Sequence, residues 1–143
     1  MKRILVINGP NLNLLGTREK TVYGNLTLNE INSKLQLVAD QHAVKLDFFQ
    51  SNFEGELIEK LHSAEGVYQG IILNPAAFSH YSYGIADAIT AITVPVVEVH
   101  ISNIYKREQF RHKSVVAKTA VGQISGLGDY SYIAALLYFI DLD

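Results

Sequence analysis

The sequence contains no cysteine among its 143 residues, so it can form no disulfide, no thiolate metal site and no cysteine nucleophile. It also lacks a strong charge of either sign. With a formal net charge of −2 at pH 7, we expect no binding to nucleic acid or to an anionic membrane. No apolar run approaches the roughly 20 residues of a transmembrane helix. An apolar strand begins almost at Met1, where a secretory signal would stand, so we expect a cytoplasmic protein.

Several motifs that carry cofactor chemistry are also missing. There is no G-x-G-x-x-G or P-loop for a nucleotide or flavin, and no G-x-S-x-G for a serine nucleophile. His80, His100 and His112 do not have the spacing of metal ligands. Lys20 and Lys106 lie on polar segments, unlike the desolvated lysine that imine chemistry needs. We therefore expect no cofactor and no metal.

Short apolar runs and helical patterns alternate along the whole chain. Strands are expected at 3–7, 44–50, 70–73, 96–99 and 119–124, and helices at about 27–42, 51–61, 81–92, 104–112 and 130–140. Strict alternation predicts parallel βαβ units with right-handed crossovers. The expected fold is α/β: a three-layer, doubly wound, five-stranded parallel sheet, flavodoxin-like, with strand order 2-1-3-4-5. No linker interrupts the pattern, so residues 1–143 are expected to form one domain.

Two helix starts and one long connection stand out in this pattern. Thr27 and Ser51 each precede a glutamate by three residues, which is the spacing of a capping box. Segment 8–24, after the first strand, is about three times the usual length of a strand-to-helix loop, as functional lids often are. Leu12, Leu14 and Leu15 give its first half apolar side chains to bury, whereas its polar second half is expected to be mobile.

Polar side chains gather where the expected strands end, and ligands of such sheets bind at that edge, where the strand order reverses. They include Asn8, Asn11, Arg18 and Tyr23 after the first strand, Gln50 and Ser51 after the second, Asn74 and His80 after the third, and Glu98, His100 and Ser102 at the fourth. The sequence therefore predicts a site between the first and third strands.

Two of these pairs carry candidate proton-transfer chemistry. Glu98 and His100 are two apart on a strand and so point to the same face, where the carboxylate would fix the tautomer of the imidazole and favour its protonated form. The alternative is a solvated pair with no role. Arg18 and Tyr23 share the lid. A phenol with a pKa near 10 costs roughly 4 kcal/mol to use as a base at neutral pH, of which a nearby arginine recovers about 1.5–4 kcal/mol. On spacing alone, a solvated arginine and a packed tyrosine remain the simpler interpretation.

Other polar residues are ambiguous by pattern. Asn11, Asn74 and His80 fit loop turns and a helix cap, but could instead hold a water or substrate hydroxyls. Asp87 within a helix reads as a solvated residue. Arg107 and Arg111 are four apart on an expected helix and read as its charged outer face.

Taken together, the motifs resemble the type II 3-dehydroquinate dehydratases. The resemblance runs in order through 9–19 (GPNLNLLGTRE), 23–24 (YG), 74–80 (NPAAFSH), 86–88 (ADA), 98–104 (EVHISNI), 107–112 (REQFRH), Gly122 and 126–128 (GLG). It covers essentially the whole chain, and the family's fold is the one predicted above.

The resemblance implies loss of water from 3-dehydroquinate to give 3-dehydroshikimate, in the shikimate pathway of aromatic amino-acid biosynthesis. The family eliminates water in the anti sense through an enolate, without a metal or an imine. Tyr23 would then be the base, with Arg18 stabilising its charge. Asn11 would hold a water that donates to the enolate oxygen. His100, held by Glu98, would be the acid at the departing hydroxyl.

The resemblance also implies how substrate binds. The backbone N–H groups of Ile101 and Ser102, with the Ser102 hydroxyl, would bind the carboxylate. Asn74, His80 and Arg111 would bind the ring hydroxyls.

The family forms trimers that assemble as dodecamers, and this implies a role for a neighbouring subunit. Asp87 would reach the site from that neighbour. The sequence departs from the family at Lys20, where a proline is frequent, and at Ala86, where an arginine is common. The second departure bears on a subunit contact.

Two rival functions use the same scaffold. A non-catalytic binding protein for a small polyol acid would keep the binding residues but would not need Tyr23 or His100. A flavodoxin-like electron carrier would need a phosphate loop, which the sequence lacks.

Overall fold

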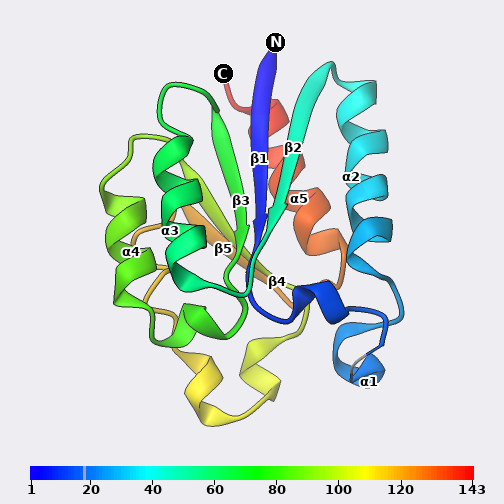
Figure 1. Ribbon diagram of the computed structural model, residues 1–143. Coiled ribbons are helices and arrows are strands. Elements are labelled where there is room, and N and C mark those ends of the chain that lie inside the picture. Colours follow the sequence, from blue (N-terminus) through cyan, green and yellow to red (C-terminus); the bar gives the residue numbers. More distant parts are fainter. Residues whose placement is uncertain (18) are drawn as a thin grey trace.

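The computed structural model describes residues 1–17 and 19–143 (Figure 1). Within them the strands are β1 (Lys2–Asn8), β2 (Val44–Gln50), β3 (Gly70–Asn74), β4 (Val96–His100) and β5 (Gly122–Ser125). All neighbouring strands are parallel, and their order is β2-β1-β3-β4-β5. The predicted α/β fold and strand order are confirmed. No helix of the described ranges is long and apolar enough to cross a membrane.

Helices cover both faces of the sheet (Figure 1). One layer contains α2 (Leu28–Gln41) and α5 (Tyr130–Asp141), and the other contains α3 (Glu54–Ser63) and α4 (Tyr83–Thr90). Short elements fill the connections: η1 (Leu12–Leu14), α1 (Lys20–Tyr23), η2 (Ala76–His80), η3 (Ile104–Lys106) and η4 (Gln109–His112), where η marks a 3-10 turn. The result is the expected three-layer arrangement.

Alternation along β1 supplies both layers of the core. Ile4 and Val6 pack into the cluster that contains Leu35 of α2, whereas Leu5 and Ile7 pack into a second cluster on the other face. All four β1 side chains are fully buried. This is why the strand reads as one continuous apolar run rather than as an alternating one.

One predicted capping box is confirmed and the other is wrong. The Thr27 hydroxyl accepts from the Glu30 N–H, and the Glu30 carboxylate accepts from the Thr27 N–H. At the start of α3 the cap position is Phe53, with no side-chain cap. Ser51 instead accepts from the Phe53 N–H and donates to Glu56. Its hydroxyl therefore does not cap α3.

The second half of the long loop after β1 contains a helical turn that the sequence does not indicate. The carbonyl of Glu19, in the left-handed region at φ 37°, accepts from the Tyr23 N–H and opens the single turn α1. Gly24, at φ 81°, ends it. In the first half Leu12 and Leu15 are buried as expected, but Leu14 is 47% exposed. Arg18 lies outside the described residues.

The predicted helix at 104–112 is wrong. Arg107 has extended backbone angles (φ −107°, ψ −167°) and separates η3 from η4. The segment buries few side chains, so no apolar stripe favours a continuous helix. The predicted strand at 119–124 is shorter, because residues 115–121 first form turns that bury Val115 and Val116.

Candidate active site

A pocket lies beyond the carboxyl ends of β1, β3 and β4, where the strand order reverses. The loops after β1 and β3 meet there. The Gly9 N–H donates to the Asn74 carbonyl at 2.8 Å, and a Cβ on Gly9 would lie 2.7 Å from the Pro75 carbonyl oxygen. Only glycine allows this close approach, which brings Asn11 into one pocket with Asn74.

The pocket collects most of the predicted site residues. Those lining it are Asn11, Tyr23, Asn74, His80, His100, Ile101, Ser102 and Arg111. Glu98 is fully buried behind His100, and Asp87 is exposed on α4, away from this lining. Arg107, which the sequence pattern assigned to an outer helix face, also lines the pocket. Its extended backbone could not be read from charge spacing.

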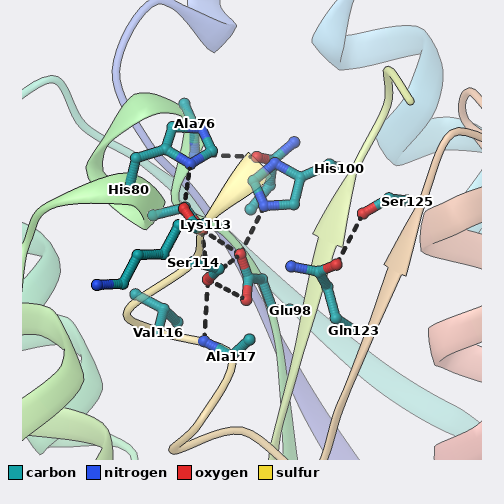
Figure 2. Close-up of polar contacts among 12 residues, drawn as sticks. Ala76, His80, Glu98, His100, Lys113, Ser114, Val116, Ala117, Gln123 and Ser125 are labelled. Carbon is teal, nitrogen blue, oxygen red and sulfur yellow. Dashed lines mark hydrogen bonds and ion pairs between the residues drawn. The ribbon is translucent and has the colours of Figure 1, made fainter. Parts of the chain in front are cut away.

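Glu98 and His100 form the buried pair that the strand spacing predicted. His100 Nε2 lies 2.6 Å from Glu98 Oε2, and the two side chains are 7% and 0% exposed (Figure 2). A carboxylate can only accept, so Nε2 carries the proton. The other ring nitrogen, Nδ1, is then the one available to a molecule in the pocket.

Ser114 also donates to Glu98 (Figure 2), and so does Ser79. Burial by itself raises the pKa of Glu98. The hydrogen bond and charge of His100 and the two serine hydroxyls outweigh burial, and the pKa falls below the ordinary value. Glu98 is therefore a buried anion held by three donors.

His80 is held in a different state from His100. Its Nδ1 lies 2.8 Å from the Lys113 carbonyl oxygen, so Nδ1 donates and Nε2 is left as an acceptor. Burial lowers the pKa of His80, and the charges of His100 and Arg111 lower it further, against the raising effect of the Lys113 carbonyl. The two imidazole rings are stacked, with centroids 6.1 Å apart. The pocket thus holds a neutral histidine beside one paired to a carboxylate.

Arg107 joins the lid to the end of β4. Its guanidinium carbon lies 5.0 Å from the centre of the Tyr23 ring, and Nη1 donates to the Ser102 hydroxyl at 3.2 Å. Among the described residues, the backbone N–H groups of Ile101 and Ser102 donate to no other protein group. One cation and these free donors form a corner suited to an anion.

A buried hydrogen-bond network that includes Tyr132 of α5 holds the Asn74 side chain in place. Its Nδ2 donates to the Tyr132 hydroxyl at 2.8 Å, and Tyr132 donates to Asn8 Oδ1 at 2.6 Å. Its Oδ1 accepts from the Ala76 N–H at 3.0 Å. This network ties the ends of β1 and β3 to α5. It also sets which way the Asn74 amide faces.

Within residues 1–17 and 19–143, no group of three or more acidic or histidine side chains is arranged to hold a metal.

Comparisons with known proteins agree with one another. The family model described as "Dehydroquinase class II" matches residues 2–140. A curated 3-dehydroquinate dehydratase from Clostridium botulinum strain Hall is 55% identical over 141 residues, which cover 99% of this chain and 96% of the relative. A protein of the same name from Bacillus cytotoxicus is 54% identical, with 99% of this chain and 97% of the relative covered.

Solved structures give the same result for the fold. The type II dehydroquinase from Butyrivibrio crossotus superposes with a TM-score of 0.94 at 42% identity, covering 96% of this chain and 97% of the other. A 3-dehydroquinate dehydratase-like protein from Bifidobacterium longum has a TM-score of 0.72 at 29% identity, covering 98% and 96%.

Proposed function

The chain belongs to the class II dehydroquinase family, and we propose that its pocket removes water from 3-dehydroquinate to give 3-dehydroshikimate. This is a hydro-lyase reaction of the shikimate pathway. One observation carries the proposal: His100, paired to a buried carboxylate, lines the same pocket as the lid phenol Tyr23. An acid and a base that face one pocket are what an elimination through an enolate requires.

In the first step Tyr23 is the base. The phenolate takes a proton from the carbon next to the ketone, and the electron pair moves to the ketone oxygen as an enolate. The Arg107 guanidinium, 5.0 Å from the Tyr23 ring, lies where it attracts the phenolate charge. Arg18 is proposed to act in the same way, and Asn11 to hold the water that donates to the enolate oxygen.

In the second step His100 is the acid. The enolate reforms the ketone, the carbon–oxygen bond to the leaving hydroxyl breaks, and His100 Nδ1 delivers the proton that makes it water. Because Glu98 accepts from Nε2, it holds the ring in place and stabilises the imidazolium that donates. Glu98 therefore acts through His100.

Substrate binding follows from the polar groups around this pair. We assign the carboxylate to the N–H groups of Ile101 and Ser102 and to the Ser102 hydroxyl, with the Arg107 charge beside them. Ring hydroxyls are assigned to Asn74, His80 and Arg111. Neutral His80 offers Nε2 as an acceptor to a hydroxyl.

The remaining assignments concern the assembly and its setting. We propose that residues 1–143 form one catalytic domain, and that it works in the cytoplasm as a homo-oligomer, a dodecamer built from trimers. Asp87 is exposed on α4, where it is accessible to a neighbouring subunit. Light scattering tests the assembly. An Asp87→Ala variant that keeps the mass of the parent assembly but loses substrate affinity would support a site shared between subunits.

The activity is tested by ultraviolet absorbance, because the product is a conjugated enone and the substrate is not. Protein in chelator should raise the absorbance of 3-dehydroquinate, and a Tyr23→Phe variant should not. Tyr130→Phe is the matched control, since Tyr130 is exposed at the start of α5. No rise with the parent would favour the non-catalytic binding protein. A rise with Tyr23→Phe would remove this phenol as the base.

A further inference from the structure

We propose that Ser79 and Ser114 are positioning residues that set the proton donor His100 by keeping Glu98 ionised and immobile. This proposal rests on the proposed function, because it takes His100 as the acid of the elimination. Ser79 is fully buried in η2, and Ser114 lies in the connection between η4 and β5. Neither lines the pocket, so neither contacts substrate.

The geometry makes these hydroxyls donors to one carboxylate. Ser114 Oγ lies 2.9 and 3.0 Å from the two oxygens of Glu98, and Ser79 Oγ donates to Oε2 (Figure 2). The two hydroxyl oxygens are themselves 2.9 Å apart. With His100 Nε2 also on Oε2, the carboxyl has three donors around it and no place for a proton of its own.

The state of Glu98 decides which nitrogen of His100 carries a proton. An ionised Glu98 accepts from Nε2 and turns Nδ1 toward the pocket. A protonated Glu98 would itself be a donor, and the Nε2–H would lose its acceptor. Burial favours the protonated form of Glu98. The serine hydroxyls, together with His100, stabilise the ionised form against this effect. The titratable groups facing Glu98 are His100 and, more weakly, His80.

One short segment holds both histidines. The Lys113 carbonyl accepts from His80 Nδ1, and the next residue, Ser114, donates to Glu98 (Figure 2). Ser114 is fixed in turn, because its hydroxyl also accepts from the Ala117 N–H at 2.9 Å. The Val115 N–H donates to the Ser79 carbonyl at 2.9 Å and closes the contact between this segment and η2. The adjacent residues Lys113 and Ser114 therefore fix both the tautomer of His80 and the carboxylate that orients His100.

The test compares Ser79→Ala and Ser114→Ala with Ser125→Ala across pH. Ser125 donates to Gln123 on the neighbouring strand β5 and not to Glu98, so its variant is the control (Figure 2). Ser79→Ala and Ser114→Ala should each lower kcat about tenfold with KM within about twofold, as loss of a supporting hydrogen bond does, whereas Ser125→Ala should change neither constant. The acid limb of the kcat profile should move to higher pH, because the pKa of Glu98 rises when a donor is lost. Ser79→Thr and Ser114→Thr, which keep the hydroxyl, should restore both.

Two further measurements separate this role from damage to the fold. In a Glu98→Gln background the serine substitutions should lower kcat by less than about twofold, because they act through a group that is already gone. The carbon-13 signal of the Glu98 carboxyl, assigned with Glu98→Gln, should titrate at higher pH in Ser114→Ala than in the parent. An unchanged titration, or equal losses in both backgrounds, would overturn the proposal. The carboxyl titration needs no turnover, so it remains decisive even if the parent does not convert 3-dehydroquinate.

Discussion

The acid and base sides of the pocket are built in opposite ways. His100 lies at the end of a central strand, 6% exposed, and its partner Glu98 is completely buried among three donors. Tyr23 ends a single helical turn within a long loop, between a left-handed Glu19 and Gly24. The sheet therefore fixes both the proposed acid and the carboxylate that orients it. The loop after β1 carries the proposed base. Substitutions on the two sides should therefore separate activity from stability.

The largest effect is expected on the base side. Tyr23→Phe should lower kcat by about 10³-fold or more, within the range of general-base catalysis. The free energy of unfolding should change by less than about 0.5 kcal/mol, because the side chain is only partly buried. Steady-state kinetics and urea unfolding measure the two quantities. A large loss of stability would mean that the loop is as structural as β4, and would break the contrast.

On the acid side, Glu98→Gln should affect both quantities. It should lower kcat by about 100-fold and destabilise the fold by about 1.5–3 kcal/mol, the value of hydrogen bonds to a buried charge. Glu59→Gln, on the exposed surface of α3, is the control. Because the folded pKa of Glu98 is depressed, its stabilisation is fully present above 4.5 and is lost as pH falls through the folded value. The stability gap between parent and variant should shrink in that acid window. A gap independent of pH would contradict an ionised Glu98.

Arg107 contacts both the base side, at Tyr23, and the strand that carries the acid, at Ser102. Its substitution should therefore affect both sides of the pocket. Arg107→Leu should raise KM about tenfold and lower kcat several-fold, because one guanidinium contacts both Ser102 and the Tyr23 ring. Arg107→Lys should recover part of KM through its charge but less of kcat, since it cannot stack on the ring in the same way. Kinetics of the two variants measure the split. Equal recovery of both constants would place Arg107 on one side only.

The smallest effect on turnover is expected beneath the pocket. Tyr132→Phe should lower kcat/KM about threefold while destabilising the fold by about 1–2 kcal/mol, because Asn8 and Asn74 each lose a buried partner. Burial raises the pKa of Tyr132, so its hydroxyl stays a donor throughout the working range. Thermal unfolding and kinetics check the two values. A loss in kcat larger than that of Glu98→Gln would assign this network to the chemistry itself.

Hydrophobic periodicity was sufficient to predict the main strands and helices. The continuous apolar β1, the Thr27 box and the two-residue spacing of Glu98 and His100 each follow from local rules, and each is confirmed. The motif resemblance then named most of the residues that line the pocket. These features depend on short stretches of chain, which a single sequence displays directly.

What the sequence could not reveal depends on distant partners. Ser51 looked like a cap, but Glu56 engages its hydroxyl. Arg107 looked like a helical surface residue, but an extended backbone turns it to Ser102. Ser114 gave no signal at all, because its importance comes from Glu98, sixteen positions earlier on another element. Side chains that serve buried charges are selected by three-dimensional contact, and no local pattern records them.

The close contact at Gly9 has a consequence for how the lid can vary among proteins of this fold. The chain enters the lid through the Gly9–Asn74 hydrogen bond and leaves it through the Thr27 capping box. Leu12 and Leu15, just inside the first anchor, pack into the core, so the part of the loop that can vary lies between Leu15 and Thr27. Doubling the length of such a loop costs only about 0.6 kcal/mol in closure entropy. Insertions and substitutions between Leu15 and Thr27 can therefore be accommodated at small cost in stability, while the end of β4 that carries Glu98 and His100 stays unaltered.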